Sequence, residues 1–398
     1  MRRALLAVLI CCLAPPVASA DVLLPPAGGV FTGLTGGSYG AFEREVGKHP
    51  AIDGVFVTWG KSLGSAFGQA RANHARLMLH ISTAEGYGAP EQITPRGIAQ
   101  GEGDGYLLEL SEAIARSDEP VYIRLLPEMD QANNAYCAFS SDGSSRGASH
   151  STANFRQAWR RVVLVLRGGP VAAINSRLHA LGLPALHGSS ATELPRLPVS
   201  FLWVPQTEGS PATQANSPDA YYPGDAYVDW VGTDFYSLFP NFSGLERFYA
   251  AHPGKPFAFG EWALWNGDDA SWVKELFAFV SSHARVRMLL YNQGERANGP
   301  FRLSRYPNAR HEVRRLIAAP RFLAYAPEWL GRAHSSSMAR SAATRLSAAS
   351  GRNSAICGLV SASVSSAVMK RGSRPVIASA CGSHGSAWSH PSRGVPGM

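Results

Sequence analysis

The stretch Lys255–Trp265, KPFAFGEWALW, places one acid, Glu261, at the end of an apolar run and directly before aromatic residues. A short apolar run bounded by turn residues is typical of a strand that is covered on both faces. Within this stretch the predicted strand covers 256–262. Runs of the same kind predict further strands at 29–34, 52–59, 76–82, 121–128, 199–205, 228–236 and 286–292.

Helical patterns lie between these runs, most clearly at 106–117, 154–168 and 269–284. Strands that alternate with helices favour parallel pairing through crossover connections. Eight such units predict an α/β fold of the (β/α)8 TIM-barrel type. The alternative is a doubly wound open sheet. Its glycine-rich fingerprint is missing, because no strand precedes GEGDG at 101–105.

Both ends of the chain differ from this central part. Residues 1–20 carry a basic start (MRR), an apolar run (ALLAVLICCLA) and a small-residue cleavage site (ASA), which predicts a cleaved secretory signal and a periplasmic or extracellular protein. The apolar run is too short to span a bilayer, and no later segment is predicted to insert in a membrane. Residues 331–398 are rich in Ser, Ala, Gly and Arg and are predicted to form a disordered tail. The barrel is therefore expected within 21–330.

The net charge of +8 belongs to these two ends. Of the 37 basic residues, eight lie beyond residue 330 and two in the leader, which leaves 27 against 29 acidic residues in 21–330. The pI of 9.4 is therefore no evidence for a nucleic-acid partner. Among the five cysteines only Cys137 lies in the central part, and there is no CxxC or HExxH motif. We expect no metal and no cofactor.

Catalytic groups of (β/α)8 barrels lie at the carboxyl ends of strands. Glu261 ends the seventh predicted strand, and Glu128, in RLLPEMD, ends the fourth. Neighbouring strands are about 4.8 Å apart, so strands four and seven face each other across the mouth with room for a sugar between them. Two carboxyl groups in different environments are what glycosidic cleavage requires.

Over residues 29–318 the chain resembles glycoside hydrolase family 26. The resemblance rests on FEREVGKHPAIDGVFVTWG, ITPRGIAQGEGDGYLLELSEAIA, RLLPEMD, AWRRVV, YVDWVGTDFYS and KPFAFGEWAL. It implies that Glu128 is the acid/base, that Glu261 is the nucleophile and that Tyr236 hydrogen-bonds the nucleophile. The best-known members cleave β-1,4-mannans, and others cleave related β-glucans or xylans. The chain departs from the family at Pro127, where histidine is usual, and at Tyr291, where tryptophan is common.

Other residues at strand ends are candidates for substrate contacts. Aromatic rings stack on sugar faces, and polar side chains bond sugar hydroxyls. The candidates are Trp59, Trp262, Trp265 and Tyr291 for stacking, and Asp130, Asp234 and Asn292 for hydrogen bonds. Each has a structural alternative: the aromatic residues as rim packing, Tyr236 as a core tyrosine, Glu261 paired with an arginine, and Glu128 bridged to Arg124.

GGSYG at 36–40 matches the G-x-S-x-G nucleophile elbow, but it follows the first strand, where an α/β-hydrolase has no elbow. We interpret it as a tight first loop. The sequence therefore predicts a secreted, monomeric retaining endo-β-glycosidase that acts on a polysaccharide. The alternative is a barrel that binds glycan without cleaving it, in exopolysaccharide assembly or at the cell surface.

Overall fold

The computed structural model describes residues 22–330. The predicted signal peptide at 1–20 and the predicted tail at 331–398 lie outside the described residues. Within 22–330, no helix combines the length and the apolarity that crossing a bilayer requires.

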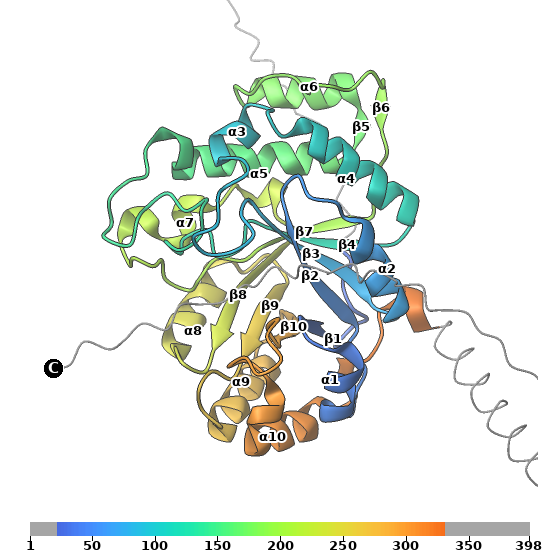
Figure 1. Cartoon of the computed structure of the whole chain (residues 1–398), viewed down its shortest axis with the longest axis vertical. Helices are drawn as coiled ribbons and strands as arrows, with labels where there is room; N and C mark the ends of the chain where they lie inside the picture. The colour runs from blue at the N-terminus through green and yellow to red at the C-terminus, as the bar shows by residue number, and fades with distance from the viewer. Residues whose placement is uncertain (1–21, 331–398) are drawn as a thin grey trace, which may run out of the picture.

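Eight parallel strands form a closed barrel (Figure 1). Seven neighbouring pairs follow the order of the chain, and β10 pairs with β1 to close the ring. The strands are β1 (Val30–Thr35), β2 (Ile52–Thr58), β3 (Arg76–Ser82), β4 (Val121–Leu125), β7 (Val199–Trp203), β8 (Trp230–Tyr236), β9 (Phe257–Ala263) and β10 (Val286–Asn292). The predicted (β/α)8 class is confirmed. The open sheet, and with it the nucleophile elbow, is excluded.

Helices surround the ring of strands and follow them along the chain (Figure 1). They are α1 (Tyr39–Val46), α2 (Gly64–Ala72), α3 (Pro95–Ala99), α4 (Asp104–Ser117), α5 (Thr152–Arg167), α6 (Val171–Ala180), α7 (Pro218–Tyr221), α8 (Phe242–Ala251), α9 (Ala270–Ser282) and α10 (Pro307–Ile317). Ser38, of the predicted first loop, is the N-cap of α1 and accepts a hydrogen bond from the Ala41 backbone N–H.

Several short strands and helical turns lie outside the eight-stranded barrel and its helices. Strands β5 (Gly169–Pro170) and β6 (Glu193–Leu194) pair antiparallel beside α6, and β11 (Phe322–Leu323) extends the sheet at the start of β1. Single turns of 3-10 helix are η1 (Ala148–His150), η2 (Gln214–Asn216), η3 (Asp225–Tyr227) and η4 (Leu303–Arg305).

The core has two parts. The larger one fills the space between the strands and the surrounding helices. The smaller one lies inside the ring and continues to Trp329. Its members include Met78, Tyr122, Trp230 and Met288, all buried. Mainly apolar side chains fill the amino-terminal part of the ring, with Arg76 as a buried exception, and the candidate site lies at the carboxyl-terminal end.

Candidate active site

Glu261 points into the barrel because β9 is bulged. The register between β8 and β9 skips Gly260, so that two consecutive residues of β9 oppose one step of β8. Ala258 faces the interior, and a regular strand would turn a side chain three positions later outward. The bulge reverses that parity. Gly260 is required here, since a Cβ atom at this position would lie 2.9 Å from the Nε of Arg124.

Three side chains hold the Glu261 carboxylate. Arg124 donates from Nη1 to Oε1 over 2.6 Å, and Asn292 donates from Nδ2 to Oε2 over 2.8 Å. Tyr236 donates its hydroxyl to Oε2 and accepts from Asn292 over 2.9 Å. The hydrogen bond that the family resemblance implied between Tyr236 and this acid is present. The structural alternative for Glu261 was a pairing with an arginine, and its Oε1 is indeed paired with Arg124.

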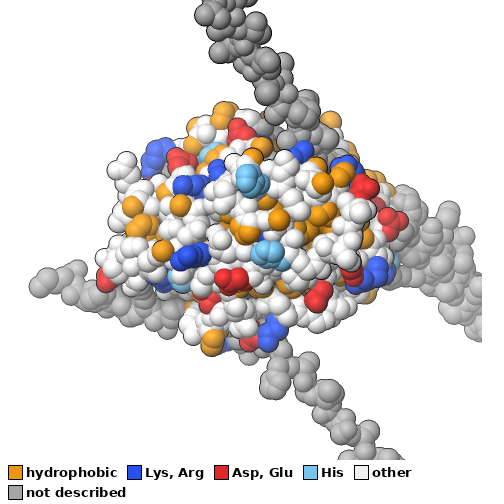
Figure 2. Space-filling model, turned by 90° about the horizontal axis from the view of Figure 1, so that it is seen from above, with side chains coloured by type: hydrophobic (Ala, Val, Ile, Leu, Met, Phe, Trp, Pro, Cys, Tyr) orange, Lys and Arg blue, Asp and Glu red, His pale blue; other side chains and the backbone are white. Residues whose placement is uncertain are grey.

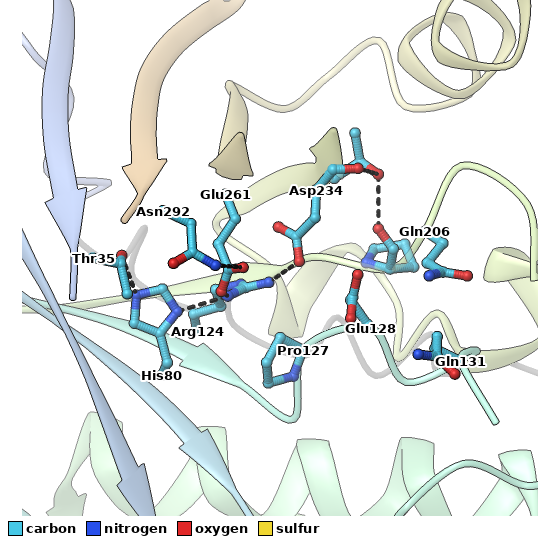
Figure 3. Close-up of polar contacts among 12 residues, drawn as sticks. Thr35, His80, Arg124, Pro127, Glu128, Gln131, Gln206, Asp234, Glu261 and Asn292 are labelled. Carbon is cyan, nitrogen blue, oxygen red and sulfur yellow. Dashed lines mark hydrogen bonds and ion pairs between the residues drawn. The ribbon is translucent and has the colours of Figure 1, made fainter. Parts of the chain in front are cut away.

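Arg124 of β4 is the centre of this polar group, and Figure 3 shows it between Glu261 and Asp234. Its Nη1 also lies 2.7 Å from the Nδ1 of His80. A guanidinium can only donate, so this histidine nitrogen is the acceptor and the proton resides on Nε2, 3.4 Å from the Thr35 hydroxyl. Burial, and then the charge of Arg124, lower the pKa of His80 well below its ordinary value, which agrees with a neutral ring.

Glu128 lies just beyond the end of β4, on a strained turn. Leu126 and Glu128 have φ angles of 43° and 49°, a left-handed conformation that costs side-chain-bearing residues on the order of 1–3 kcal/mol. Several hydrogen bonds hold the turn. The Glu128 N–H donates to the Val204 carbonyl over 2.7 Å, and Asn134 donates to the Glu128 carbonyl over 2.9 Å. The Tyr136 hydroxyl donates to the carbonyl of the preceding proline over 2.6 Å.

A tyrosine orients the Glu128 side chain. The Tyr87 hydroxyl, from the loop after β3, donates to Oε2 of Glu128 over 3.3 Å. Gln131 donates from Nε2 to the same hydroxyl over 3.2 Å. The structural alternative for Glu128 is a bridge to Arg124. The ion pairs that Arg124 forms are with Glu261 and Asp234.

One pocket joins the two glutamates. Its cavity volume is small, about 40 Å³, and the pocket is partly open to solvent. Of the predicted site residues it brings together Glu128, Glu261 and Asn292. The full lining is Phe56, Tyr87, Arg124, Pro127, Glu128, Asn134, Tyr136, Glu261, Asn292 and Phe301. Sequence reasoning missed Phe56, Tyr87, Asn134, Tyr136 and Phe301 as lining residues; most of them lie in loops after strands, where no periodic pattern marks them.

Three of the predicted stacking residues lie elsewhere. Trp262 and Tyr291 are 1 % exposed and pack edge to face, 4.8 Å between ring centroids, between the strands and the helices. Trp59 is buried against Tyr106 of α4. Successive side chains of a strand point to opposite faces, so Trp262 points outward because Glu261 points inward. These three rings are therefore core residues, and their predicted role as sugar platforms is corrected. Trp265 is half-buried and packs against Tyr236 and Phe301.

Two of the predicted hydrogen-bonding residues also lie outside the pocket lining. Asp234 is buried and paired with Arg124. Asp130 is wholly buried, and its Oδ1 accepts the Gln206 backbone N–H over 2.9 Å. Burial raises the pKa of Asp130 to about 8. In this arrangement neither carboxylate reaches a ligand in the pocket, and both support the walls.

Among residues 22–330, no three His, Cys, Asp or Glu side chains are grouped so that they could hold a metal ion. The groups of the pocket lining that can act chemically include two carboxyl groups, a buried guanidinium and the hydroxyls of Tyr87 and Tyr136.

Fold and site together define a (β/α)8 barrel with two glutamates in one pocket at the carboxyl ends of its strands. The YdhT protein from Bacillus subtilis has a similar structure, with a TM-score of 0.51, 15% identity, and 78% of this chain and 90% of that one covered. A Cellulomonas fimi endo-beta-1,4-mannanase double mutant gives a TM-score of 0.52, also at 15% identity, and covers 78% of this chain and 75% of its own. At this identity the likeness demonstrates a shared fold. No family model and no curated protein matches the sequence.

Proposed function

We propose that the chain is a retaining endo-β-glycosidase that hydrolyses a polysaccharide through Glu128 and Glu261. The observation that carries the proposal is that both carboxylates line one pocket at the carboxyl end of a closed barrel. A secreted monomer, which needs no metal and no cofactor, is the form in which we propose that it acts.

In the first step a Glu261 oxygen bonds to the anomeric carbon while the glycosidic C–O bond breaks, and Glu128 gives its proton to the leaving oxygen. In the second step water attacks the anomeric carbon, Glu128 takes the water proton, and the bond to Glu261 breaks. Arginine stays protonated, so the ion pair with Arg124 matches an ionised Glu261, the form that attacks. Asn292 and Tyr236 fix the orientation of the carboxylate.

The substrate class follows from two likenesses. The sequence resembles glycoside hydrolase family 26, and one structural neighbour is an endo-beta-1,4-mannanase. We therefore propose a β-linked glycan of the mannan kind or a relative of it. Pro127 stands where the family usually has histidine, and it lines the pocket beside Glu128. This difference alters the surface that meets the sugar and leaves both carboxylates in the pocket.

A barrel that binds glycan without cleaving it is the second candidate. The observation that favours it is the network around Glu261, in which both carboxylate oxygens accept hydrogen bonds. These three hydrogen bonds occupy three of about four lone-pair sites of the carboxylate and lower its nucleophilicity. Turnover on a panel of mannan, glucan, xylan and bacterial exopolysaccharide separates the two functions, because a binding barrel releases no reducing ends.

The test of the mechanism is Glu128→Ala. Positioned proton transfer contributes about 10²–10⁴-fold, so cleavage of a natural glycosidic bond should fall by that factor. The first step on an activated aryl glycoside should survive, because its leaving group needs little protonation. Azide should then restore turnover and yield the β-glycosyl azide. An α-configured azide product, or equal losses on both substrates without rescue, would show that Glu128 is not the acid/base.

Glu261→Gln is the companion variant. It keeps the shape of the side chain but cannot attack, so turnover should vanish while glycan binding persists. A 2-deoxy-2-fluoro glycoside should label the wild type on this residue. Label on Glu128 instead, or undiminished hydrolysis by the variant, contradicts the assignment. A crystal structure should place the two carboxyl groups about 5–5.5 Å apart, the separation typical of retaining enzymes.

A further inference from the structure

The surface between α1 and α10 carries a groove lined by cations. The two helices lie side by side on the outside of the barrel, at the bottom of Figure 1. The groove, of about 560 Å³, is lined by Arg44 and Glu45 of α1 and by Arg310, His311 and Arg314 of α10. Three guanidinium groups thus face one carboxylate, and this balance favours an anionic ligand.

The groove continues to the mouth of the barrel. A second depression, of about 410 Å³, shares Ala41 and Glu45 with the groove and adds Gln293, Glu295 and Arg302 to its wall, so the surplus of cations lies in the groove itself. We call this depression the rim pocket. The loop after β10 separates it from the catalytic pocket: Asn292 and Phe301 line the catalytic side, and the residue after each lines the rim pocket. A chain that leaves the catalytic pocket across this loop meets the arginines.

Two of the arginines have no structural partner in the described part of the chain. Arg314 is occupied, since it donates to the backbone carbonyls of Arg44 and Glu45 at the end of α1 over 3.0 and 3.4 Å. Arg302 donates to loop carbonyls. Among the hydrogen bonds and ion pairs of residues 22–330, none comes from the side chains of Arg44 or Arg310.

The charges of the groove are only partly balanced, because Glu45 is the one carboxylate of its lining and attracts both Arg44 and Arg310. Arg310 and Arg314 are four residues apart on α10, a spacing at which like charges repel. Arg44 is in the last turn of α1, where a cation is favourable, but Arg310 is the fourth residue of α10, close to the N-terminus, where the helix dipole does not favour a cation.

Glu45 gives the groove a second property. One of its carboxylate oxygens, Oε2, is buried and has no hydrogen-bond partner within residues 22–330. Burial raises the pKa of Glu45, and the neighbouring Arg310 opposes that shift. Because Oε2 is enclosed, a ligand hydroxyl can donate to Glu45 only at the other carboxylate oxygen, Oε1.

This clustering is local. Residues 21–330 hold 27 basic and 29 acidic side chains, so the barrel as a whole is slightly negative. On the face shown in Figure 2, Lys and Arg are interspersed with Asp and Glu. The groove thus departs from the mixed charge seen on that face.

We propose that the groove and the rim pocket bind a polysaccharide that carries carboxylate groups, and that the glycan cleaved by the proposed glycosidase is therefore one that contains uronic acid. This inference rests on the proposed function for the cleavage step alone. The planar fork of arginine matches a carboxylate through paired hydrogen bonds, whereas a neutral glycan would leave Glu45 as the one carboxylate opposite three guanidinium groups.

The test compares two ligands that differ only at carbon 6 of each sugar. Mannohexaose and the β-1,4-linked mannuronate hexamer have the same backbone, but the second carries a carboxylate on every sugar. Calorimetric titration of the Glu261→Gln protein at low salt should give at least tenfold tighter binding of the mannuronate, and added salt should reduce that preference. Equal affinity for the two hexamers would overturn the proposal.

The variant Arg44→Gln/Arg310→Gln, made in the same Glu261→Gln protein, should weaken mannuronate binding about tenfold and leave mannohexaose binding unchanged. The matched control is Arg177→Gln/Arg196→Gln, which removes the same charge from exposed arginines in and after α6, a helix drawn at the top of Figure 1, away from α1 and α10. Equal losses of mannuronate affinity in both double variants would mean that the protein's net charge, and not the groove, determines binding. Tighter binding of dextran sulfate than of mannuronate would mean that the groove binds polyanions in general and does not select carboxylates, which would contradict the proposal.

Binding and cleavage fail separately in this design. Release of reducing ends by the wild type from manno-oligosaccharide, without mannuronate binding, would sustain the glycosidase and reject the uronic acid ligand. Mannuronate binding that depends on Arg44 and Arg310 would sustain the groove even if no glycan is cleaved.

Discussion

Arg124 determines the electrostatics of the pocket. Its side chain is 1 % exposed and it faces the carboxyl groups of Glu261 and Asp234, so a buried cation and two buried acids share one small volume. Burial raises the pKa of Asp234 well above its ordinary value, and the charge of Arg124 opposes that shift. Such a group is stable only when every member is partnered, because a charge left alone in the interior costs several kcal/mol. His80 supports the cation as a neutral acceptor. The same network therefore orients Glu261 and prevents Arg124 from turning away.

Tyr87 is the residue whose role is most specific to the proposed acid/base. In Tyr87→Phe the hydrogen bond to Glu128 is lost while the ring remains. One hydrogen bond to a charged group is worth about 1.5 kcal/mol, so kcat/KM on a substrate with a poor leaving group should fall about tenfold. An activated aryl glycoside, whose cleavage depends less on proton transfer, should lose less than threefold.

The control for Tyr87→Phe is Tyr106→Phe, which removes a buried hydroxyl without a hydrogen-bond partner in the described chain and leaves the pocket untouched. It should not affect either substrate. A parallel loss on both substrates in Tyr87→Phe would mean that the hydroxyl contacts the sugar and does not position Glu128.

Asp130 makes stability depend on pH. Burial raises its pKa from 3.8 to about 8, so between these values the folded protein keeps a proton that the unfolded chain has lost. The stabilisation is complete below about pH 4 and is lost as the pH rises toward 8, by up to about 1.4 kcal/mol per pH unit. Asp130→Asn cannot titrate. The free energy of unfolding of the wild type minus that of the variant, from urea titrations, should therefore decrease between pH 5 and pH 8.

The comparison with Asp130→Asn is needed because Asp53, whose pKa is raised by burial to about 6, acts with the same sign. Its contribution cancels in the difference. A difference that stays constant from pH 5 to pH 8 would show that Asp130 is ionised throughout that range.

At the scale of elements, a buried ion pair joins α4 to α5. Asp104 accepts from Nε and Nη2 of Arg161 over 2.7 and 2.5 Å, and both side chains are at most 2 % exposed. Arg161 also donates to the carbonyls of Pro184 and Ala185 over 2.8 and 3.0 Å. Because α5 follows the loop that carries Glu128, this pair fixes the layer behind the acid/base.

Arg161→Ala should therefore lower the free energy of unfolding by about 3–5 kcal/mol, since it leaves Asp104 buried without its partner. Arg116→Ala provides the control on α4. That arginine is exposed and pairs with Glu112 four residues away, so its loss should cost about 0.3–0.5 kcal/mol. Chemical denaturation measures both. Losses of similar size would mean that water reaches the Asp104 site.

The elements themselves were largely predictable from sequence. The strand predicted at 286–292 is β10, and the helix predicted at 106–117 lies within α4 (Asp104–Ser117). Continuous apolar runs identify such strands because both faces of a barrel strand are covered. The pair β5–β6 was not predicted, since two residues carry no periodicity.

Side-chain direction was less predictable. Trp262 was expected in the mouth because it adjoins Glu261, but neighbours on a strand point to opposite faces, and the bulge at Gly260 determines which one points inward. The residue that the bulge accommodates, Gly260, leaves no room for a Cβ atom beside Arg124, which lies 136 positions earlier in the sequence, and no local pattern encodes that close approach. The partners of Arg124, and Tyr87 beside Glu128, are long-range contacts of the same kind.

For the whole molecule, the barrel is open to ligands at one end and filled at the other. Segments before β1 and after β11 fill the amino-terminal side. Leu23 and Trp329 pack on the interior cluster, and Arg76 lies below them with its side chain 4 % exposed. Glu328 pairs with Arg76 through two bonds of 2.7 Å, and Arg76 also donates to the Leu23 carbonyl over 3.0 Å. The residues that follow the last strand are therefore part of the barrel.

This base predicts where the chain can be shortened. A chain that ends at Leu330 keeps Glu328 and Trp329, and it loses a segment whose composition predicts disorder, so its melting temperature and its activity should match those of the full chain.

A chain that ends at Ala324 leaves Arg76 buried without its carboxylate and removes a buried tryptophan. Each loss costs about 3–5 kcal/mol, so melting should fall by roughly 10 °C or more. Trp329→Ala in the chain that ends at Leu330 should reproduce about half of that loss in calorimetry. A large drop on cutting after Leu330 would instead show that the segment beyond it docks on the barrel.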